Sequence, residues 1–193
     1  SNKHETIKPK DLVGIPWRVA LALQQDGWYL RSDIIWHKPN AMPESAQDRP
    51  TRDHEYIFLL SKSKKYHYDA DAIREPHTSL DDFERRTNKT YSENITKGGT
   101  AEQQLGRNRG EFYHPKGRNK RTVWSINTKP YPDTHFAVFP KQLVRQIVLA
   151  GCPENGIVLD TFAGSGTTLE VATELNRHYV GIEINTDYLP LIK

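Results

Sequence analysis

The chain has 193 residues, enough for one ordinary domain with a core and at most one small insertion. Hydrophobic residues make up 36% and charged residues 26%, and the formal net charge is +3. No stretch approaches the roughly 18 apolar residues that a membrane span needs, and the N-terminus lacks the apolar core of a signal peptide. The single cysteine, Cys152, cannot form an internal disulfide, and no Cys/His set has zinc-like spacing. We therefore expect an intracellular, cytoplasmic protein without membrane contact or bound metal.

The first zone of the chain, residues 1–71, has the pattern of regular secondary structure. Apolar residues recur at near-helical spacing over 16–25, where Pro16 fits the first turn of a helix and Asp26-Gly27 ends it. Two apolar runs of strand type follow, over 32–37 and 54–60. The pattern also predicts that residues 65–68 return as a hairpin partner of the second strand.

The middle zone, residues 72–122, is poor in aliphatic residues and is predicted to be an insertion or long loop, largely irregular. Near its end a cluster of basic residues accompanies a single acid, Glu111. The cluster consists of Arg107, Arg109, Lys116, Arg118, Lys120 and Arg121. Such a local excess can neutralise phosphates of a nucleic acid; the alternative is a solvated loop whose charge only keeps it in water.

The third zone, residues 123–193, reads as helix, strand, helix, strand. A helix over 140–150 places Leu143, Ile147 and Ala150 on one face. The runs at 156–160 and 178–184 are typical of buried strands, and 167–176 between them is helical. A strand, a Gly-rich turn, a helix and a second strand in this order predict a right-handed βαβ unit of a parallel sheet.

The turn after the first of these strands has the composition of a ligand-binding loop. Gly164 and Gly166 allow the backbone to approach a ligand, and the helix that follows directs its free N–H groups at the same place. Asp160 ends the first strand and Glu183 ends the second. A carboxylate at the second position can accept hydrogen bonds from both ribose hydroxyls of a nucleoside.

A nicotinamide dinucleotide is the alternative ligand of such a unit. Its fingerprint has a third glycine three residues after Gly166, and that position holds Leu169. The third glycine permits close helix–strand packing beside a pyrophosphate. Its absence favours a nucleoside ligand without a pyrophosphate, such as S-adenosylmethionine (AdoMet).

Several motifs together resemble the N4-cytosine/N6-adenine DNA methyltransferase family. The segment DTFAGSGTT (160–168) is similar to the AdoMet-binding motif of that family, HFAVFPKQL (135–143) to the segment before it, and YVGIEIN (179–185) to the one after it. Upstream, LVGIPWRVALAL (12–23), DIIWHKPNAMPES (33–45) and RDHEYIFLLSKSKKYHYD (52–69) resemble elements of the catalytic half. The likeness covers about two thirds of the chain and leaves the middle zone unmatched.

This resemblance implies an α/β fold with a Rossmann-like, AdoMet-dependent methyltransferase sheet and an inserted, largely irregular target-recognition segment. The implied cofactor contacts are Asp160, Phe162, Ala163, Gly164, Ser165, Gly166, Thr167, Glu183, Phe139, Pro140 and Lys141. Two of these have structural alternatives. Phe162 lies against the adenine ring or packs in the core, and Lys141 meets the cofactor carboxylate or only occupies the first turn of a helix.

The motif order resembles the β class, in which catalytic-half elements (1–71) precede a target-recognition region (72–122) and the AdoMet-binding half (123–193). The implied substrate is double-stranded DNA with a flipped base. A cognate restriction endonuclease and a homodimer are further partners that the resemblance suggests, in a bacterial or phage-encoded protein. Pocket candidates at the end of the first strand are Trp36, which is as well explained as a core residue, His37 and Pro39. His54-Glu55 is better explained by structural hydrogen bonds than by acid/base work.

The catalytic Ser/Asp-Pro-Pro-aromatic tetrapeptide of the family is expected before Leu12, and the eleven residues there do not contain it. We therefore expect a fragment, a truncated homologue or the ordered remainder of a longer protein. The resemblance implies AdoMet-dependent methylation of an exocyclic amino group in DNA, and the alternative is a catalytically incomplete DNA/AdoMet-binding module or partner subunit of a methyltransferase. The target base stays open without the tetrapeptide. The stretch from Ile15 to Ser45 resembles family members that carry Ser-Pro-Pro-Tyr, which favours N4-cytosine over N6-adenine.

Overall fold

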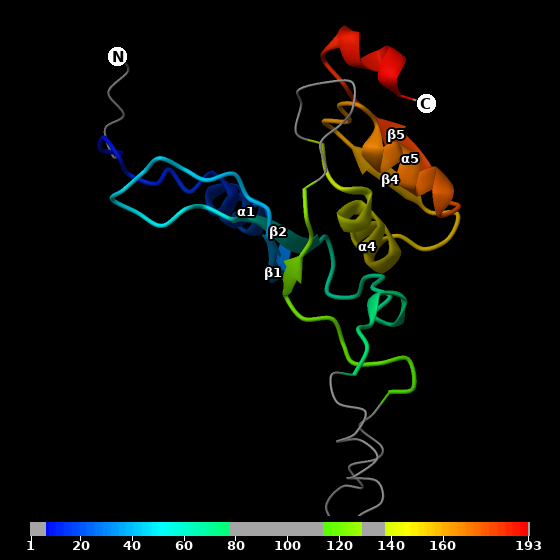
Figure 1. Ribbon diagram of the computed structural model, residues 1–193. Helices are drawn as coiled ribbons and strands as arrows, with labels where there is room; N and C mark the ends of the chain where they lie inside the picture. The colour runs from blue at the N-terminus through cyan, green and yellow to red at the C-terminus, as the bar shows by residue number, and fades with distance from the viewer. Residues whose placement is uncertain (1–6, 78–113, 129–137, 193) are drawn as a thin grey trace, which may run out of the picture. The chain divides into compact units, whose positions relative to one another are not determined.

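The computed structural model describes residues 7–77, 114–128 and 138–192 (Figure 1). The chain divides into two compact units. Unit 1 joins Ser1–Tyr68 to Arg121–Lys193, and unit 2 comprises Asp69–Lys120. Within the described ranges, no helix is both long and apolar enough to cross a membrane.

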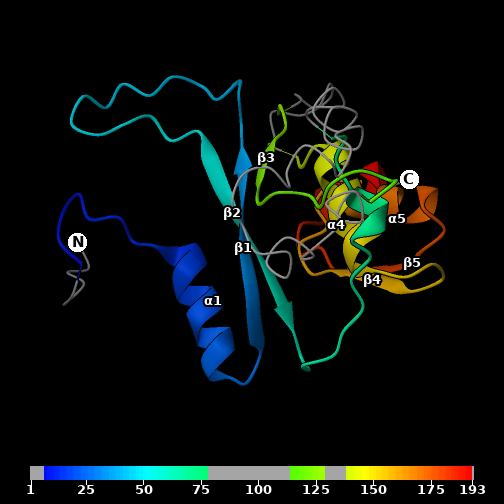
Figure 2. The same ribbon diagram turned by 90° about the horizontal axis from the view of Figure 1, so that it is seen from below.

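The first half of unit 1 is a mixed three-stranded sheet with one helix beside it (Figure 2). Its elements are α1 (Ile15–Gln25), β1 (Tyr29–His37), β2 (His54–Ser61) and β3 (Val123–Ser125), and the strand order is β2-β1-β3. β1 pairs antiparallel with β2 and parallel with β3. The helix and both long strands were predicted from the sequence, whereas β3 was not.

The pairing of β2 differs from the prediction. β2 pairs with β1, in a register that places Trp36 opposite Glu55 and His37 opposite His54. Residues 65–68 contain no strand, so the predicted hairpin return there is wrong. Period-two alternation identifies a strand but carries no information about its partner, and here the partner lies beyond a long loop.

The two faces of this sheet are covered differently. Side chains alternate along a strand, so the register places His37 and Tyr56 on one face and Trp36 on the other. On the first face Trp17 of α1 meets Tyr56 and Phe58 edge-on, with ring centroids 5.6 and 4.9 Å apart. On the second face Trp36 packs in a buried cluster. That cluster comprises Trp36, Trp124, Ile126 and Leu143.

The second half of unit 1 is the βαβ unit that the sequence predicts, preceded by a helix. Its elements are α4 (Lys141–Gly151), β4 (Ile157–Asp160), α5 (Thr167–Glu174), β5 (His178–Gly181) and the 3-10 helix η4 (Thr186–Leu191). β4 and β5 pair in parallel, which confirms the predicted topology of this segment. The helices α4 and α5 pack together through Val144, Val148 and Val171.

The buried face of α4 is partly different from the predicted one. Leu143 and Ala150 are buried as expected, but Ile147 is 40% exposed. Val144 and Val148, one helical turn apart, fill the core instead. The apolar stripe of α4 is therefore rotated towards Val144, because this face packs against α5 while Leu143 reaches the Trp36 cluster.

Unit 2 is closed by contacts between its two described segments, 69–77 and 114–120. The backbones of Glu75 and Arg118 exchange two hydrogen bonds, at 3.0 and 2.8 Å. Gly117 lies so close to this bridge that a Cβ would stand 2.2 Å from the carbonyl oxygen of Glu75. Arg74 Nη1 also donates to the Gly117 carbonyl, at 3.0 Å. We call this arrangement the stem of unit 2.

Candidate functional site

The turn after β4 is held against the chain that leaves β5. The backbone N–H of Ile182 donates to the Asp160 carbonyl at 2.8 Å, and that of Ala163 donates to the Ile182 carbonyl at 2.9 Å. Both strands end at this place, since Asp160 is in register with Gly181. The carboxyl ends of neighbouring parallel strands are where open α/β sheets bind ligands.

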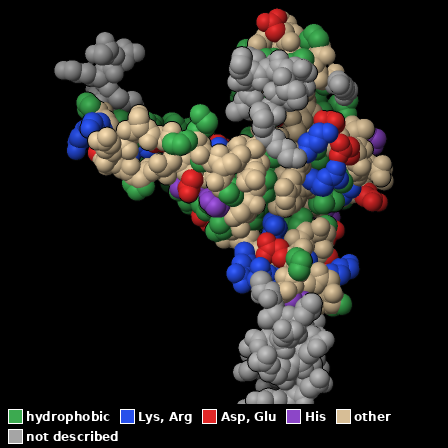
Figure 3. All heavy atoms as spheres, in the orientation of Figure 1, with side chains coloured by type: hydrophobic (Ala, Val, Ile, Leu, Met, Phe, Trp, Pro, Cys, Tyr) green, Lys and Arg blue, Asp and Glu red, His purple; other side chains and the backbone are tan. Residues whose placement is uncertain are grey.

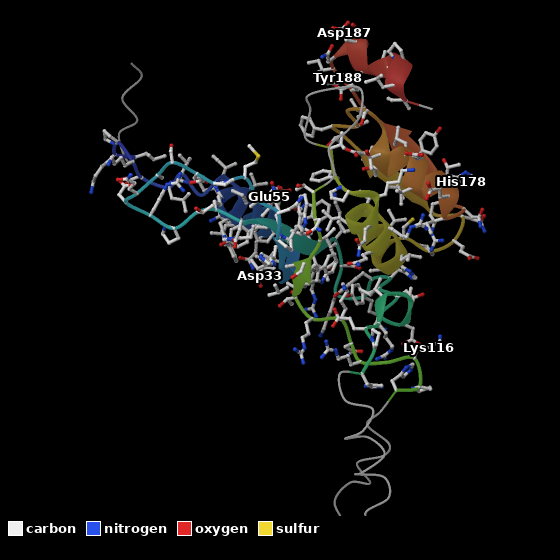
Figure 4. All side chains as sticks on the ribbon, in the orientation of Figure 1. Asp33, Glu55, Lys116, His178, Asp187 and Tyr188 are labelled. Carbon is white, nitrogen blue, oxygen red and sulfur yellow. The ribbon has the colours of Figure 1, made fainter. Side chains whose placement is uncertain are left out.

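Glu183 and the Gly-rich turn, which the sequence places far apart, are in direct contact. The backbone N–H of Gly164 donates to Glu183 Oε2 at 2.6 Å, and that of Asn185 donates to Oε1 at 2.8 Å. The carboxylate is thus fixed between the turn and the start of η4. Figure 4 labels His178 at the start of β5, and Asp187 and Tyr188 in η4 at the other end of the segment 178–191.

The turn itself is shaped by Asp160 and by two left-handed glycines. Asp160 Oδ1 accepts the backbone N–H of Phe162 at 3.0 Å. Gly164 and Gly166 have φ of +53° and +85°, a region that a residue with a Cβ adopts only at a cost. Gly166 is the N-cap of α5, so the open N–H groups of the first turn, from Thr167 onward, face the same side as the turn.

Two large apolar side chains beside Glu183 are open to solvent. Phe162 is 87% exposed and Ile184 is 95% exposed. Core packing of Phe162, one of the two alternatives from the sequence, is therefore wrong. Ala163, between Phe162 and Gly164, is buried and anchors the turn. These two side chains are therefore free to contact a ligand beside the Glu183 carboxylate.

Leu169, at the place of the third glycine of a dinucleotide fingerprint, packs against β5. A Cβ on Gly181 would stand 2.7 Å from Leu169 Cδ1. The close approach of helix and strand is therefore achieved with a glycine on the strand and a leucine on the helix, the reverse of the dinucleotide arrangement. Gly181 was not singled out in the sequence, although a glycine inside a strand is a signal of close approach.

The predicted cofactor-binding residues upstream of the turn, Phe139, Pro140 and Lys141, contact other parts of the protein. Lys141 bonds Glu170 and Glu174 of α5, the latter at 3.1 Å, and these bonds raise the pKa of its ammonium group. Lys141 lies in the first turn of α4, and its contact to the cofactor stays a prediction. Phe139 is 54% exposed and meets Trp36 edge-on at 6.2 Å, while Pro140 is buried as the N-cap of α4. For Phe139 and Pro140 a cofactor role stays a prediction.

At the carboxyl end of β1, the pocket candidates separate into buried and accessible residues. Trp36 is 3% exposed, and its indole N–H donates to the Ile126 carbonyl at 2.8 Å, so it is a core residue. His37 is partly exposed and Pro39 is exposed. Asn40 holds the following loop in place through two hydrogen bonds with the backbone of Thr128, at 3.0 and 2.9 Å.

Beside His37 the structure shows a side-chain cluster that sequence reasoning missed. His37 Nδ1 lies 3.0 Å from Ser125 Oγ, and its Nε2 lies 3.8 Å from Asp53 Oδ2. The other oxygen of Asp53 contacts His54 Nδ1 at 3.2 Å. The hydrogen bond from His54, and to a lesser degree the nearby His37, lowers the pKa of the Asp53 carboxyl. No sequence signal links these residues, because Ser125 follows unit 2 in the sequence and reaches His37 only through the pairing of β3 with β1.

The predicted DNA-binding residues of the described segments carry ion pairs. Lys116 lies 3.4 Å from Asp71, and Arg118 and Lys120 lie 3.1 and 3.2 Å from Glu75. Arg121 is exposed, whereas Arg107 and Arg109 lie outside the described residues. In Figure 3, blue and red side chains adjoin on the described surface of unit 2. Lys116, Arg118 and Lys120 therefore hold the stem together, in addition to any role towards phosphates.

No group of three or more His, Cys, Asp or Glu side chains that could hold a metal ion occurs among the residues the structure covers. The candidate site therefore consists of backbone N–H groups, the Glu183 carboxylate and exposed apolar side chains.

The comparisons with known proteins agree with this geometry. A family profile described as DNA methylase matches residues 1–193. The chain belongs to the DNA methylase family. It is 51% identical over 191 residues to the Type II methyltransferase M.SmaI of Serratia marcescens, and 48% identical over 187 residues to M.Cfr9I of Citrobacter freundii. These alignments cover 98% and 97% of this chain, and 53% and 51% of the relatives. The chain thus spans about half the length of these methylases.

Solved structures confirm the Rossmann-like methyltransferase fold. The PvuII DNA methyltransferase (cytosine-N4-specific) matches with a TM-score of 0.62 at 16% identity, over 93% of this chain and 58% of that one. The M1.HpyAVI-SAM complex matches with a TM-score of 0.58 at 21% identity, over 94% of this chain and 69% of that one. The resemblance stated from the motifs is confirmed at the level of family and fold.

Proposed function

We propose that this chain forms the AdoMet-binding and DNA-facing part of a site-specific methyltransferase that methylates an exocyclic amino group in double-stranded DNA. The observation that carries the proposal is the contact between Gly164 N–H and Glu183 Oε2, at the shared carboxyl end of β4 and β5. It joins the two groups that a nucleoside needs, a backbone turn and a ribose-binding carboxylate.

The residues present fit AdoMet better than a dinucleotide. One carboxylate oxygen of Glu183 can exchange its backbone donor for a ribose hydroxyl, and Phe162 and Ile184 offer apolar surface to an adenine ring. Leu169 fills the place where a dinucleotide fold has a glycine beside the pyrophosphate. When bound there, AdoMet supplies the methyl group from its sulfonium centre.

On the DNA side, the chain contributes the carboxyl end of β1 and the segments of unit 2. His37 and Pro39 are the accessible candidates for the lip of a pocket that receives a flipped base. Unit 2 together with the residues that directly follow it is the proposed target-recognition segment, with the basic residues Arg107, Arg109, Lys116, Arg118, Lys120 and Arg121. The Ser/Asp-Pro-Pro-aromatic motif of the family is not among these 193 residues.

Isothermal titration of AdoMet tests the cofactor site. Replacing Glu183 with Ala removes charge-assisted hydrogen bonds, so the dissociation constant should rise by a factor corresponding to about 1.5–3 kcal/mol. Glu154→Ala is the matched control, because Glu154 is an exposed acid in the loop before β4. Equal AdoMet affinity of the Glu183 variant and the control would remove the ribose-binding role.

The target base is the finer part of the proposal. The resemblance of residues 15–45 to members with Ser-Pro-Pro-Tyr favours N4-cytosine over N6-adenine. Methylation of plasmid DNA by the complete protein, followed by digestion to nucleosides and mass spectrometry, distinguishes N4-methylcytosine from N6-methyladenine. A homodimer and a cognate restriction endonuclease are further proposed partners.

A second candidate function is a non-catalytic module that binds DNA and AdoMet as a partner of another subunit. It is the alternative that the sequence left open. The same plasmid assay separates the two: AdoMet and DNA binding without any methyl transfer by the complete protein would support the module.

A further inference from the structure

The carboxyl ends of the parallel pair β1 and β3 carry three polar side chains in a line. Asp53 faces Nε2 of His37 at 3.8 Å, and Ser125 Oγ lies 3.0 Å from Nδ1 on the other side of the ring. The three come from the end of the β1–β2 loop, from β1 and from β3. Ser125 is exposed at the end of this line, on the sheet edge where the proposed function places DNA.

The position of Asp53 indicates which atom donates in the hydrogen bond between Ser125 and His37. At 3.8 Å Asp53 is too far from Nε2 for a hydrogen bond, but its negative charge favours the tautomer of a neutral His37 in which Nε2 carries the hydrogen and Nδ1 is left as an acceptor. The Ser125 hydroxyl then donates its single hydrogen to Nδ1. Its two lone pairs remain directed away from the ring, and Ser125 is presented as an acceptor.

The surrounding charges favour a neutral donor over a phosphate. Asp33 and Asp53 lie on the same side of the sheet as His37, together with His54 and Tyr56 of β2. Lys38 bonds Glu55, which shares the opposite face with Trp36 (Figure 4 labels Asp33 and Glu55). The carboxylates would repel a phosphate at this place. A phosphate would also need a hydrogen-bond donor, and the single hydroxyl hydrogen of Ser125 is already donated to His37.

We propose that Ser125 is a DNA-contacting residue that accepts a hydrogen bond from the amino group of a base, and that His37 and Asp53 are the positioning residues that set its polarity. This inference rests on the proposed function, since it assumes that DNA lies at this edge.

The test uses the complete protein and measures DNA affinity, kinetics of methyl transfer to plasmid DNA, and AdoMet affinity. Ser125→Ala should raise the dissociation constant and the KM for DNA about fivefold, with kcat within about twofold, as expected for one neutral hydrogen bond. AdoMet affinity should not change. Ser32→Ala is the matched control, because Ser32 of β1 bonds only the Asp33 carbonyl in its own strand.

The positioning role has a separate readout in rescue by a conservative variant. His37→Ala should weaken DNA binding like Ser125→Ala. His37→Asn should restore most of the affinity, since an amide oxygen replaces Nδ1 as the acceptor. His54→Asn, which leaves His37 and Ser125 in place, should bind DNA like the wild type.

Two outcomes overturn the proposal and are distinct from failure of the proposed function. If the wild type methylates DNA while Ser125→Ala matches Ser32→Ala in DNA affinity and KM, Ser125 makes no contact. If His37→Asn binds DNA as weakly as His37→Ala, an acceptor at the place of Nδ1 does not set the polarity of Ser125. Absence of methyl transfer by the wild type would instead overturn the proposed function, and this inference with it.

Discussion

Leu169 of α5 limits the size of the residue at position 181 of the neighbouring strand β5. Leu169 is 3% exposed, and its Cδ1 occupies the space where a side chain of Gly181 would begin. Gly181→Ala should destabilise the fold by about 1–3 kcal/mol, the usual cost of an added methyl group in a packed core. Urea denaturation followed by circular dichroism measures the change.

Leu169→Ala is the companion variant in this experiment. Alone it should cost about 2–5 kcal/mol by leaving a cavity. In the double variant the methyl group added by Gly181→Ala enters that cavity, so the combined loss should be smaller than the sum of the two single losses. A simple sum would mean that Gly181 and Leu169 are not coupled.

Substitution of Phe162 should affect ligand affinity without affecting the stability of the fold. Because its side chain is 87% exposed, Phe162→Ala should change the free energy of unfolding by less than about 0.5 kcal/mol. Loss of an aromatic face beside the adenine should weaken AdoMet binding by about 0.5–1.5 kcal/mol in titration calorimetry. Ile157→Ala is a control of similar exposure at the other end of β4. A loss of affinity in both variants, or in neither, would contradict the adenine contact.

Among the elements, those with a local sequence signal were predicted and those that depend on distant partners were not. The apolar periodicity of α1 and α5 and the apolar runs of β2 and β4 are properties of consecutive residues. The three residues of β3 are too few to give a pattern, and they become a strand only because β1 offers an open edge.

The candidate site divides in the same way. The Gly164–Gly166 turn and the acid at Glu183 follow from residue type and position, and the structure brings them into contact. The Asp53–His37–Ser125 line depends on the β1–β3 pairing and on a loop end, so no spacing in the sequence indicates it. The ion pairs of Lys141 with Glu170 and Glu174 likewise depend on the packing of α4 against α5, and its cofactor contact stays a prediction.

The α4–α5 contact makes a prediction about pH. The hydrogen bond from Lys141, and then the charges of Lys141 and Arg145, lower the pKa of the Glu174 carboxyl from its ordinary value of 4.5. A carboxyl with a lowered pKa in the folded state stabilises the fold above its ordinary pKa and loses this contribution as the pH falls through the lowered value. Glu174→Gln should therefore lower Tm near neutral pH, and the difference from the wild type should shrink below pH 4.5.

Thermal denaturation at a series of pH values measures this difference. Glu154→Gln should show no such pH-dependent gap, since Glu154 lies outside the α4–α5 ion pairs. Lys141→Met should lower Tm in the same way as Glu174→Gln while leaving AdoMet affinity unchanged. A marked loss of AdoMet affinity in Lys141→Met would return Lys141 to the cofactor site.

At the scale of the whole molecule, the basic residues near the end of unit 2 have two different tasks. Arg118 and Lys120 share Glu75 at the stem, with side chains 26% and 12% exposed, whereas Arg121 is exposed outside unit 2. The sequence could not separate these roles, because Glu75 lies far upstream of the basic cluster. Arg121→Ala should reduce the slope of log K against log salt for DNA binding by about 0.9, the value for one phosphate contact. Arg118→Ala should mainly lower Tm.

Fluorescence anisotropy with a labelled duplex at several salt concentrations measures these slopes. Gln146→Ala, on α4, is a neutral control that should leave the slope unchanged. If Arg121→Ala leaves the slope at its wild-type value, Arg121 belongs to the solvated surface and not to the DNA interface.

The stem also predicts that residues 78–113, which connect its two segments, can be replaced by a linker without loss of the fold. His77 Nε2 lies 3.0 Å from the His114 carbonyl oxygen, so the two ends of 78–113 leave the stem next to each other. Replacing 78–113 with a short Gly-Ser linker should preserve the Glu75–Arg118 bridge, the fold of unit 1 and the affinity for AdoMet. Since unit 2 is the proposed target-recognition segment, the same variant should bind all DNA sequences with similar affinity. Calorimetry with AdoMet and competition between duplexes of different sequence measure the two effects. Retained discrimination between sequences would place target recognition elsewhere in the protein.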